Sequence, residues 1–130
     1  MNRYLLDTHA LIWWMMDSAR LPANCRLAIE NEQATVFASS VSAYEIALKH
    51  SIGKLPIGDS LLPGYERDLA DVGLRELPVS TSHALKAGQL DLAHRDPFDR
   101  LLIAQALAEN LTLVSSEQLF DDFGVKRLWT

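Results

Sequence analysis

Cysteine is almost absent from this 130-residue chain, which carries Cys25 alone. A single cysteine cannot form a disulfide within the chain, so the fold must be held together by its core rather than by covalent cross-links. A chain of this length can bury a core of sufficient size in one domain. We therefore expect a single domain over residues 1–130 that works in a reducing compartment, the cytoplasm.

Long apolar runs and an excess of basic charge are also missing. No stretch of about 18 uncharged apolar residues occurs, so we expect no membrane partner. The apolar segment 10–16 is short and follows Asp7 and His9, which argues against a signal peptide. Twelve Lys and Arg against 17 Asp and Glu give a net charge of −5. A nucleic-acid ligand would therefore require a local basic patch or metal ions.

Several motifs of enzyme chemistry are absent as well. The chain has neither common type of glycine-rich phosphate loop and no Gly-x-Ser-x-Gly sequence. Its four histidines have no zinc-ligand spacing, and Cys25 lies in an ordinary helical pattern that is typical of a packing residue. The sequence therefore supports neither phosphate-loop nucleotide binding, nor serine hydrolysis, nor zinc chemistry.

Strand-like and helical segments alternate along the chain. Aliphatic and β-branched residues predict strands at 3–6, 35–39, 74–79, 111–116 and 125–129. Capping residues and helical periodicity predict helices at 9–16, 22–32, 42–52 (capped by Ser40 or Ser42), 64–72, 81–88 (opened by Thr81 or Ser82) and 96–110. Helices between successive strands indicate βαβ units, so we expect an α/β fold with a parallel sheet covered on both faces.

Four acidic residues follow the predicted strands. They are Asp7 directly after the first strand, Glu45 and Asp99 early in the two helices that begin near 42 and 96, and Glu117 after the fourth strand. The carboxyl ends of parallel strands meet at one edge of a sheet, which is where such folds bind ligands. We therefore expect all four carboxylates at that edge, although Glu117 could equally be a solvated loop residue.

The other acids also have structural interpretations. Asp7 can cap the helix that follows it. Glu45 can form an ion pair with Lys49, one helical turn away. In the sequence "DPFD", Asp96 can cap the long helix and Asp99 can be its capping-box partner. For each residue taken alone, these interpretations stay open.

Helical phase favours buried positions for two of the acids. Each shares a helix face with three apolar residues: Glu45 with Val41, Leu48 and Ile52, and Asp99 with Leu102, Ile103 and Ala106. A buried carboxylate needs a partner, and the nearby Lys49 and Arg100 are expected on other faces. Clustered carboxylates repel one another unless a divalent metal neutralises them. Oxygen-only ligands favour Mg²⁺ or Mn²⁺.

A metal site of this kind can activate water and stabilise charge on a phosphodiester. It would also offset the repulsion between an acidic protein and a polyanion. Basic residues around the site are candidates for phosphate contacts, and each can equally be a solvated surface charge: Lys49, His50, Lys54, Arg95 and Arg100. His94, close in sequence to Asp96 and Asp99, is a further candidate for the rim.

Four segments resemble the PIN-domain family, and most closely the VapC toxins of bacterial toxin–antitoxin pairs. They are LLDTHALIWW, SSVSAYEIALKHSIGKL, HRDPFDRLLIAQALAENLTLVSSE and FGVKRLW, which occur in the family's order and spacing from near the start of the chain to near its end. The resemblance implies a three-layer α/β/α domain around a parallel sheet of four to five strands. It also implies an endoribonuclease that depends on Mg²⁺ or Mn²⁺, forms a homodimer, and is inhibited by a cognate antitoxin inserted near the active site.

The resemblance assigns roles by position. Asp7, Glu45 and Asp99 match the three catalytic, metal-binding acids, and Asp96 matches an extra aspartate that is common in the "DPFD" version. Thr8 and Ser115 match hydroxyl residues that support the site. The fourth family acid is usually the aspartate of a Thr-x-Asp sequence, whereas this chain has Glu117 in "SSE". The longer side chain leaves open whether Glu117 binds metal directly, through water or not at all.

Two alternatives remain at this stage. The chain could be a binding module that has lost catalysis, an idea kept open by Glu117 in place of aspartate. It could also be an RNA-processing nuclease without an antitoxin. The sequence does not separate that second alternative from a toxin, whereas an adjacent small antitoxin-like reading frame would.

Overall fold

A five-stranded sheet organises the chain, for which the computed structural model describes residues 2–91 and 96–130. The elements in chain order are β1 (Arg3–Leu6), α1 (Thr8–Met15), α2 (Ala23–Glu30), β2 (Thr35–Ser39), α3 (Ser40–Ser51), α4 (Gly58–Leu61), α5 (Tyr65–Asp71), β3 (Arg75–Leu77), α6 (Thr81–Gly88), α7 (Pro97–Glu109), β4 (Thr112–Val114), the 3-10 helix η1 (Gln118–Phe123) and β5 (Arg127–Leu128).

All four strand pairs of the sheet are parallel, in the order β3-β2-β1-β4-β5. The predicted parallel α/β fold is therefore confirmed. β1 lies in the centre, where Leu6 is in register with Ala38 of β2 on one side and Val114 of β4 on the other. Chain connections run to both sides of β1, so its carboxyl end lies at a switch point of the kind where open α/β sheets bind ligands.

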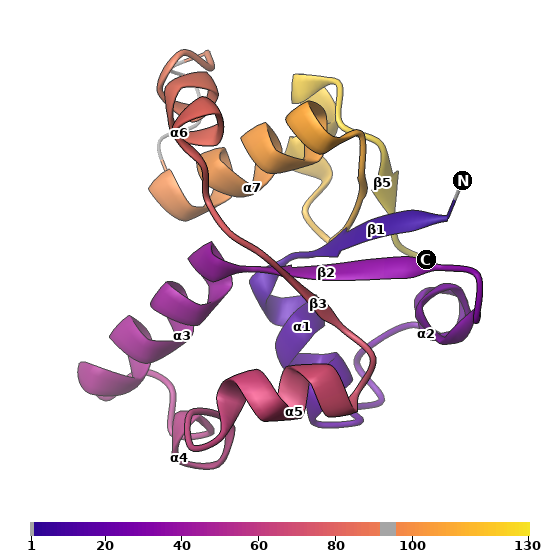
Figure 1. The fold of residues 1–130 in the computed structure, drawn as a ribbon, viewed down its shortest axis with the longest axis vertical. Helices are drawn as coiled ribbons and strands as arrows, with labels where there is room; N and C mark the ends of the chain where they lie inside the picture. Colours follow the sequence, from indigo (N-terminus) through magenta and orange to yellow (C-terminus); the bar gives the residue numbers. More distant parts are fainter. Residues whose placement is uncertain (1, 92–95) are drawn as a thin grey trace.

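Helices cover both faces of the sheet, which gives the expected three layers (Figure 1). Alternate residues of β1 face opposite layers. Leu6 packs in a core cluster with residues of α1, α2 and α5, whereas Leu5 packs in a second cluster with residues of α7 and η1. Within the described parts of the chain, no helix is long and apolar enough to span a bilayer.

Capping decides where several helices begin, and here the structure corrects the predicted boundaries. Ser39 caps α3 by accepting from the amide of Val41 (3.0 Å), in place of Ser40 or Ser42. Ser80 caps α6, in place of Thr81 or Ser82. Adjacent hydroxyl residues have similar capping propensity, so composition alone does not choose among them. The segment around Gly58, which lies outside the predicted helices and strands, contains the short helix α4.

The predicted apolar stripe of α3 is only partly buried. Val41 is buried, but Leu48 and Ile52 are exposed. α3 projects beyond the edge of the sheet, so its second half has no sheet to cover (Figure 1). The stripe predicted for α7 is confirmed, because Leu102, Ile103 and Ala106 are all buried in the core.

Candidate active site

A small polar pocket lies at the carboxyl ends of the central strands. Its volume is about 140 Å³. The residues that line it come from the β1–α1 junction, from α3, from the start of α7 and from the segment after β4: Asp7, Thr8, His9, Glu45, Lys49, Asp96, Asp99 and Glu117. The fold thus brings all five predicted acids to one place, together with Lys49 and Thr8.

Asp7 lies at the junction of β1 and α1. Its amide continues the sheet by donating to the carbonyl of Val114 (3.0 Å). Its Oδ1 accepts from the amide of Ala10 (2.8 Å), so the capping interpretation is confirmed. The same side chain also lines the pocket. Capping and facing the pocket are compatible because one carboxylate oxygen is sufficient for the cap.

The electrostatics of Asp7 are those of a buried anion. Burial raises the pKa of the Asp7 carboxyl above its ordinary value, because removal from water disfavours the charged form. Hydrogen bonds from the Ser115 hydroxyl and the Ala10 amide, and the charge of His9, oppose this rise in pKa only in part. The negative charge of Glu117 adds to it. A bound cation would remove the imbalance.

Glu45 is buried and both of its oxygens have partners. Oε1 accepts from the Thr8 hydroxyl (2.7 Å), and this hydroxyl also lies 3.0 Å from that of Ser42. Oε2 accepts from the Lys49 ammonium (2.5 Å). The predicted ion pair between Glu45 and Lys49 is therefore confirmed, and the prediction that Lys49 lies on another face of the helix is wrong, because residues four apart share a helix face. Thr8 supports the position of Glu45, as the resemblance implied.

The first turn of α7 supplies two acids. Pro97 is the first helical residue, and Oδ1 of Asp96 accepts from the amides of Phe98 (2.9 Å) and Asp99 (3.2 Å). Asp96 is exposed, whereas Asp99 is half-buried. The cap predicted from "DPFD" is confirmed. It sets the phase of the helix, and this phase places Asp99 on the lining of the pocket.

Ser115 and Glu117 follow β4. Ser115 is fully buried, donates its hydroxyl proton toward Asp7 and accepts from the amide of Glu117 (3.0 Å). Glu117 is exposed at the start of η1, so its carboxylate reaches the pocket from the solvent side. Ser115 therefore links Asp7, the central acid of the site, to the loop that carries Glu117.

Among the residues that the structure describes, the other predicted basic side chains do not line the pocket. The guanidinium of Arg100 donates to the carbonyls of Ala87 (2.7 Å) and Leu90 (2.9 Å), at the end of α6. These bonds attach Arg100 to the end of α6, and its phosphate contact stays a prediction. His50 pairs with Asp59 (2.6 Å). Lys54 is exposed outside the pocket lining, and the predictions for His94 and Arg95 lie outside the described residues.

Sequence reasoning missed two residues of the site. His9 lines the pocket beside Asp7 and Thr8, and its position two residues after the strand-end acid is the signal that could have found it. Ser42 is fully buried and contacts Thr8. It precedes Glu45 by three residues, so helical spacing places both side chains on one face.

The donor set fits a hard divalent cation. All of the acidic side chains in the pocket offer oxygen, which Mg²⁺ and Mn²⁺ prefer. Within residues 2–91 and 96–130, no three His, Cys, Asp or Glu side chains are arranged to hold one ion together. Mg²⁺ keeps several waters and needs only one or two direct carboxylates, so a pocket with water-mediated outer contacts suits it.

Comparisons with known proteins agree with this architecture. A family model described as PIN domain matches residues 4–126. Similar solved structures include VapBC2 from Rickettsia felis bound to a promoter DNA fragment (TM-score 0.70, 20% identity, 98% of this chain and 99% of that chain). They also include DNA-bound VapBC from Salmonella typhimurium (TM-score 0.70, 19% identity, 98% of each chain). A third is FitAcB from Neisseria gonorrhoeae (TM-score 0.68, 19% identity, 96% of each chain).

Among curated proteins, no sequence matches the chain significantly. The structural matches are at most 20% identical to it, so they establish a shared fold. The family model, by contrast, spans nearly the whole chain, from the first residues of β1 to the start of β5. The parallel sheet, the acidic pocket at its carboxyl edge and this match lead to one conclusion: the protein belongs to the PIN domain family.

Proposed function

We propose that the protein is a metal-dependent endoribonuclease and the toxin of a VapBC-type pair. The observation that carries the proposal is the gathering of five carboxylates from separate parts of the chain around one pocket. Buried Asp7, whose pKa is raised by loss of solvation, is the acid that gains most from a bound cation. The toxin–antitoxin complexes among the similar structures support the finer assignment.

The residues of the pocket have distinct roles in this proposal. Asp7, Glu45 and Asp99 hold Mg²⁺ or Mn²⁺ directly or through water, and Asp96 and Glu117 assist through water. When bound, the ion would activate a water molecule and neutralise negative charge on the scissile phosphate. Thr8 and Ser115 orient Glu45 and Asp7 by the hydrogen bonds described above, so that both carboxylates are held before substrate binds.

Cleavage assays test this function. Structured and unstructured RNAs, labelled at one end, are incubated with the protein in Mg²⁺, in Mn²⁺ or in EDTA. We expect internal cleavage with either metal and none with EDTA. Absence of cleavage with both metals would favour the alternative of a binding module, and cleavage that persists in EDTA would contradict the metal site.

A second groove supports an antitoxin partner. It has a volume of about 450 Å³ and is lined mainly by apolar residues of α1 and of the segment after α3, including Ile12, Trp13, Leu55 and Ile57. His9 lines both this groove and the acidic pocket. An apolar segment bound in the groove would therefore lie next to the acids, as expected for an inhibitory antitoxin.

Growth experiments separate a toxin from a processing nuclease. We expect expression of the chain to arrest growth of a bacterial host, and co-expression of the product of the adjacent reading frame to restore it. The variant Asp7→Asn, expressed at the same level, is the matched control and should leave growth unaffected. Normal growth with an active nuclease would favour the processing enzyme.

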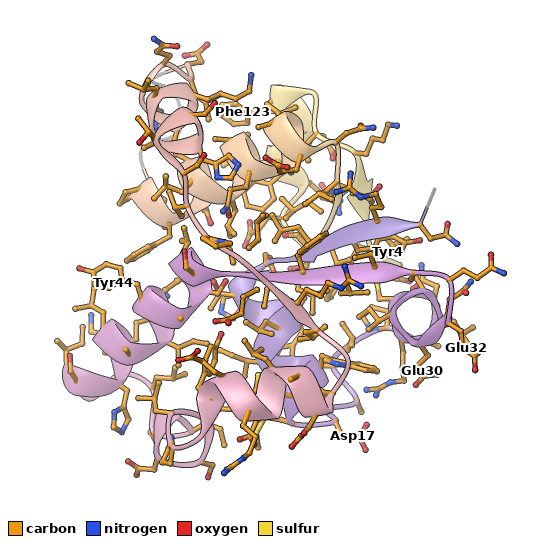
Figure 2. All side chains as sticks on the ribbon, viewed as in Figure 1. Tyr4, Asp17, Glu30, Glu32, Tyr44 and Phe123 are labelled. Carbon is orange, nitrogen blue, oxygen red and sulfur yellow. The ribbon has the colours of Figure 1, made fainter. Side chains whose placement is uncertain are left out.

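An apolar hollow supports a homodimer. It has a volume of about 440 Å³ and is lined by Val41 and Tyr44 of α3, by Val79 and by Phe98 and Leu101 of α7. Tyr44 is largely exposed at the surface (Figure 2). The centroid of its ring lies 5.7 Å from that of the Phe98 ring. Exposed aromatic residues around a hollow are typical of protein interfaces. Light scattering should give the mass of two chains, and the mass of one chain would contradict the dimer.

The two outer acids should contribute unequally to metal binding. Asp99 is half-buried and rigidly placed by the first turn of α7, whereas Glu117 is exposed. We expect Asp99→Asn to weaken Mn²⁺ binding about tenfold and Glu117→Gln by no more than about threefold. Both changes remove one negative charge, so each is the control for the other. Equal losses in a calorimetric titration would contradict this ranking.

A further inference from the structure

Lys49 occupies the part of the pocket where a metal ion is expected. Its ammonium lies 2.5 Å from Oε2 of Glu45, while Thr8 holds the other oxygen of the same carboxylate. Among the described residues that line the pocket, Lys49 is the single Lys or Arg. Oε2 of Glu45, the oxygen that Thr8 does not engage, is thus paired with a cation that the protein itself supplies.

The carboxylate of Glu45 needs a cation at all times. Its side chain is only 10% exposed, and an unpaired charge in such a position is costly. The Lys49 side chain is 40% exposed and has a long flexible stem, so it can leave the pocket for solvent at little cost. A divalent ion and an ammonium at one oxygen repel each other, so binding of the ion favours the departure of Lys49.

We propose that Lys49 is a tethered counter-cation that holds Glu45 when no metal is bound and is displaced from it when a divalent cation enters. This inference rests on the proposed function, because it requires a metal in the pocket. In the metal-free protein Oε2 of Glu45 is engaged by Lys49, so a metal that binds this oxygen must displace the ammonium. It also keeps the buried acid neutralised during folding and between catalytic cycles.

A metal that enters the pocket must first displace Lys49, and this displacement costs free energy. Substitution of Lys49 should therefore tighten metal binding. We expect Lys49→Met to lower the dissociation constant for Mn²⁺ about two- to fivefold, the range that corresponds to loss of a half-exposed ion pair. Lys49→Arg keeps the pair and should not tighten binding. Lys54→Met is the matched control, because it removes the same charge five residues further along, outside the pocket lining.

The titration is read by electron paramagnetic resonance of free Mn²⁺, without RNA. Tighter binding by Lys49→Met alone supports the exchange. Equal tightening by Lys49→Met and Lys54→Met would show that only the net charge of the protein matters, which would overturn the proposal. Unchanged binding by Lys49→Met would overturn it as well. If none of the proteins, including the wild type, binds Mn²⁺, the proposed function fails and the exchange fails with it.

A second measurement uses the wild-type chain and therefore does not depend on a variant that folds. The sequence has four lysines, Lys49, Lys54, Lys86 and Lys126, so selective ¹³C labelling of the lysine ε-carbon gives four assignable signals. On addition of diamagnetic Mg²⁺, the Lys49 signal should move toward the position of a solvated lysine while the other three stay in place. A Lys49 signal that stays in place at saturating Mg²⁺ would overturn the proposal.

Discussion

Asp7→Asn lowers the rate of metal-dependent RNA cleavage at least about 100-fold while the protein remains folded. Asp7 is the most buried acid of the pocket and lies at the central switch point of the sheet. Asparagine has the same shape and can still accept the hydrogen bond from Ala10, but it lacks the negative charge that attracts the ion. The rate is measured on an end-labelled RNA at saturating Mg²⁺, with circular dichroism to confirm folding.

The control for this experiment is Glu32→Gln. Glu32 lies in the connection that leads into β2, away from the carboxyl edge of the sheet, and Figure 2 shows it at the periphery of the molecule. This change removes one negative charge without touching the pocket and should leave the rate within about twofold. Cleavage by Asp7→Asn at a rate close to that of the wild type would show that Asp7 is a helix cap and nothing more.

Asp7→Asn also stabilises the metal-free protein at neutral pH. The pKa of the Asp7 carboxyl is higher in the folded state than in the unfolded state. The stability that this carboxyl contributes is therefore fully present at a pH below its pKa in the unfolded state, and it is lost as the pH rises through its pKa in the folded state. At pH 7 the wild type therefore bears the cost of a buried charge that asparagine does not have. We expect a gain on the order of 1 kcal/mol, or about 3–5 °C in Tm.

Two measurements test whether removal of the buried charge causes the gain in stability: its pH dependence and the stability of Asp7→Ala. In EDTA, the gain of Asp7→Asn should shrink as the pH falls through the raised pKa of Asp7, because the wild-type carboxyl is then protonated as well. Asp7→Ala removes the same charge but also the hydrogen bond to Ala10, so it should be about 1 kcal/mol less stable than Asp7→Asn. A gain that does not vary with pH would contradict the electrostatic explanation.

The fold and the position of the site follow from local patterns in the sequence. Aliphatic segments such as 3–6 and 35–39 predict buried strands, and the intervening helices require the strands to be parallel. Asp7, Glu45 and Asp99 could therefore be placed at one edge without any knowledge of long-range contacts. The first turn of α7 was also predictable, because Asp96 and Pro97 form a local start signal.

Contacts made by long flexible side chains could be predicted only in part. The four-residue spacing predicts the ion pair of Lys49 with Glu45, but not that this pair lies inside the acidic pocket. Arg100 pairs with backbone carbonyls at the end of α6, which carry no sequence signal. The exposed position of Leu48 and Ile52 depends on how far α3 extends past the sheet, a property of tertiary structure.

Anomalous diffraction from crystals soaked in Mn²⁺ tests most directly whether the acids at the carboxyl edge form a metal site. We expect a peak in the anomalous difference map within the pocket lined by Asp7, Glu45 and Asp99, and its loss in crystals of Asp7→Asn. A well-bound Mn²⁺ elsewhere on the molecule, or a pocket that stays without a peak at Mn²⁺ concentrations that support RNA cleavage, would contradict the assignment.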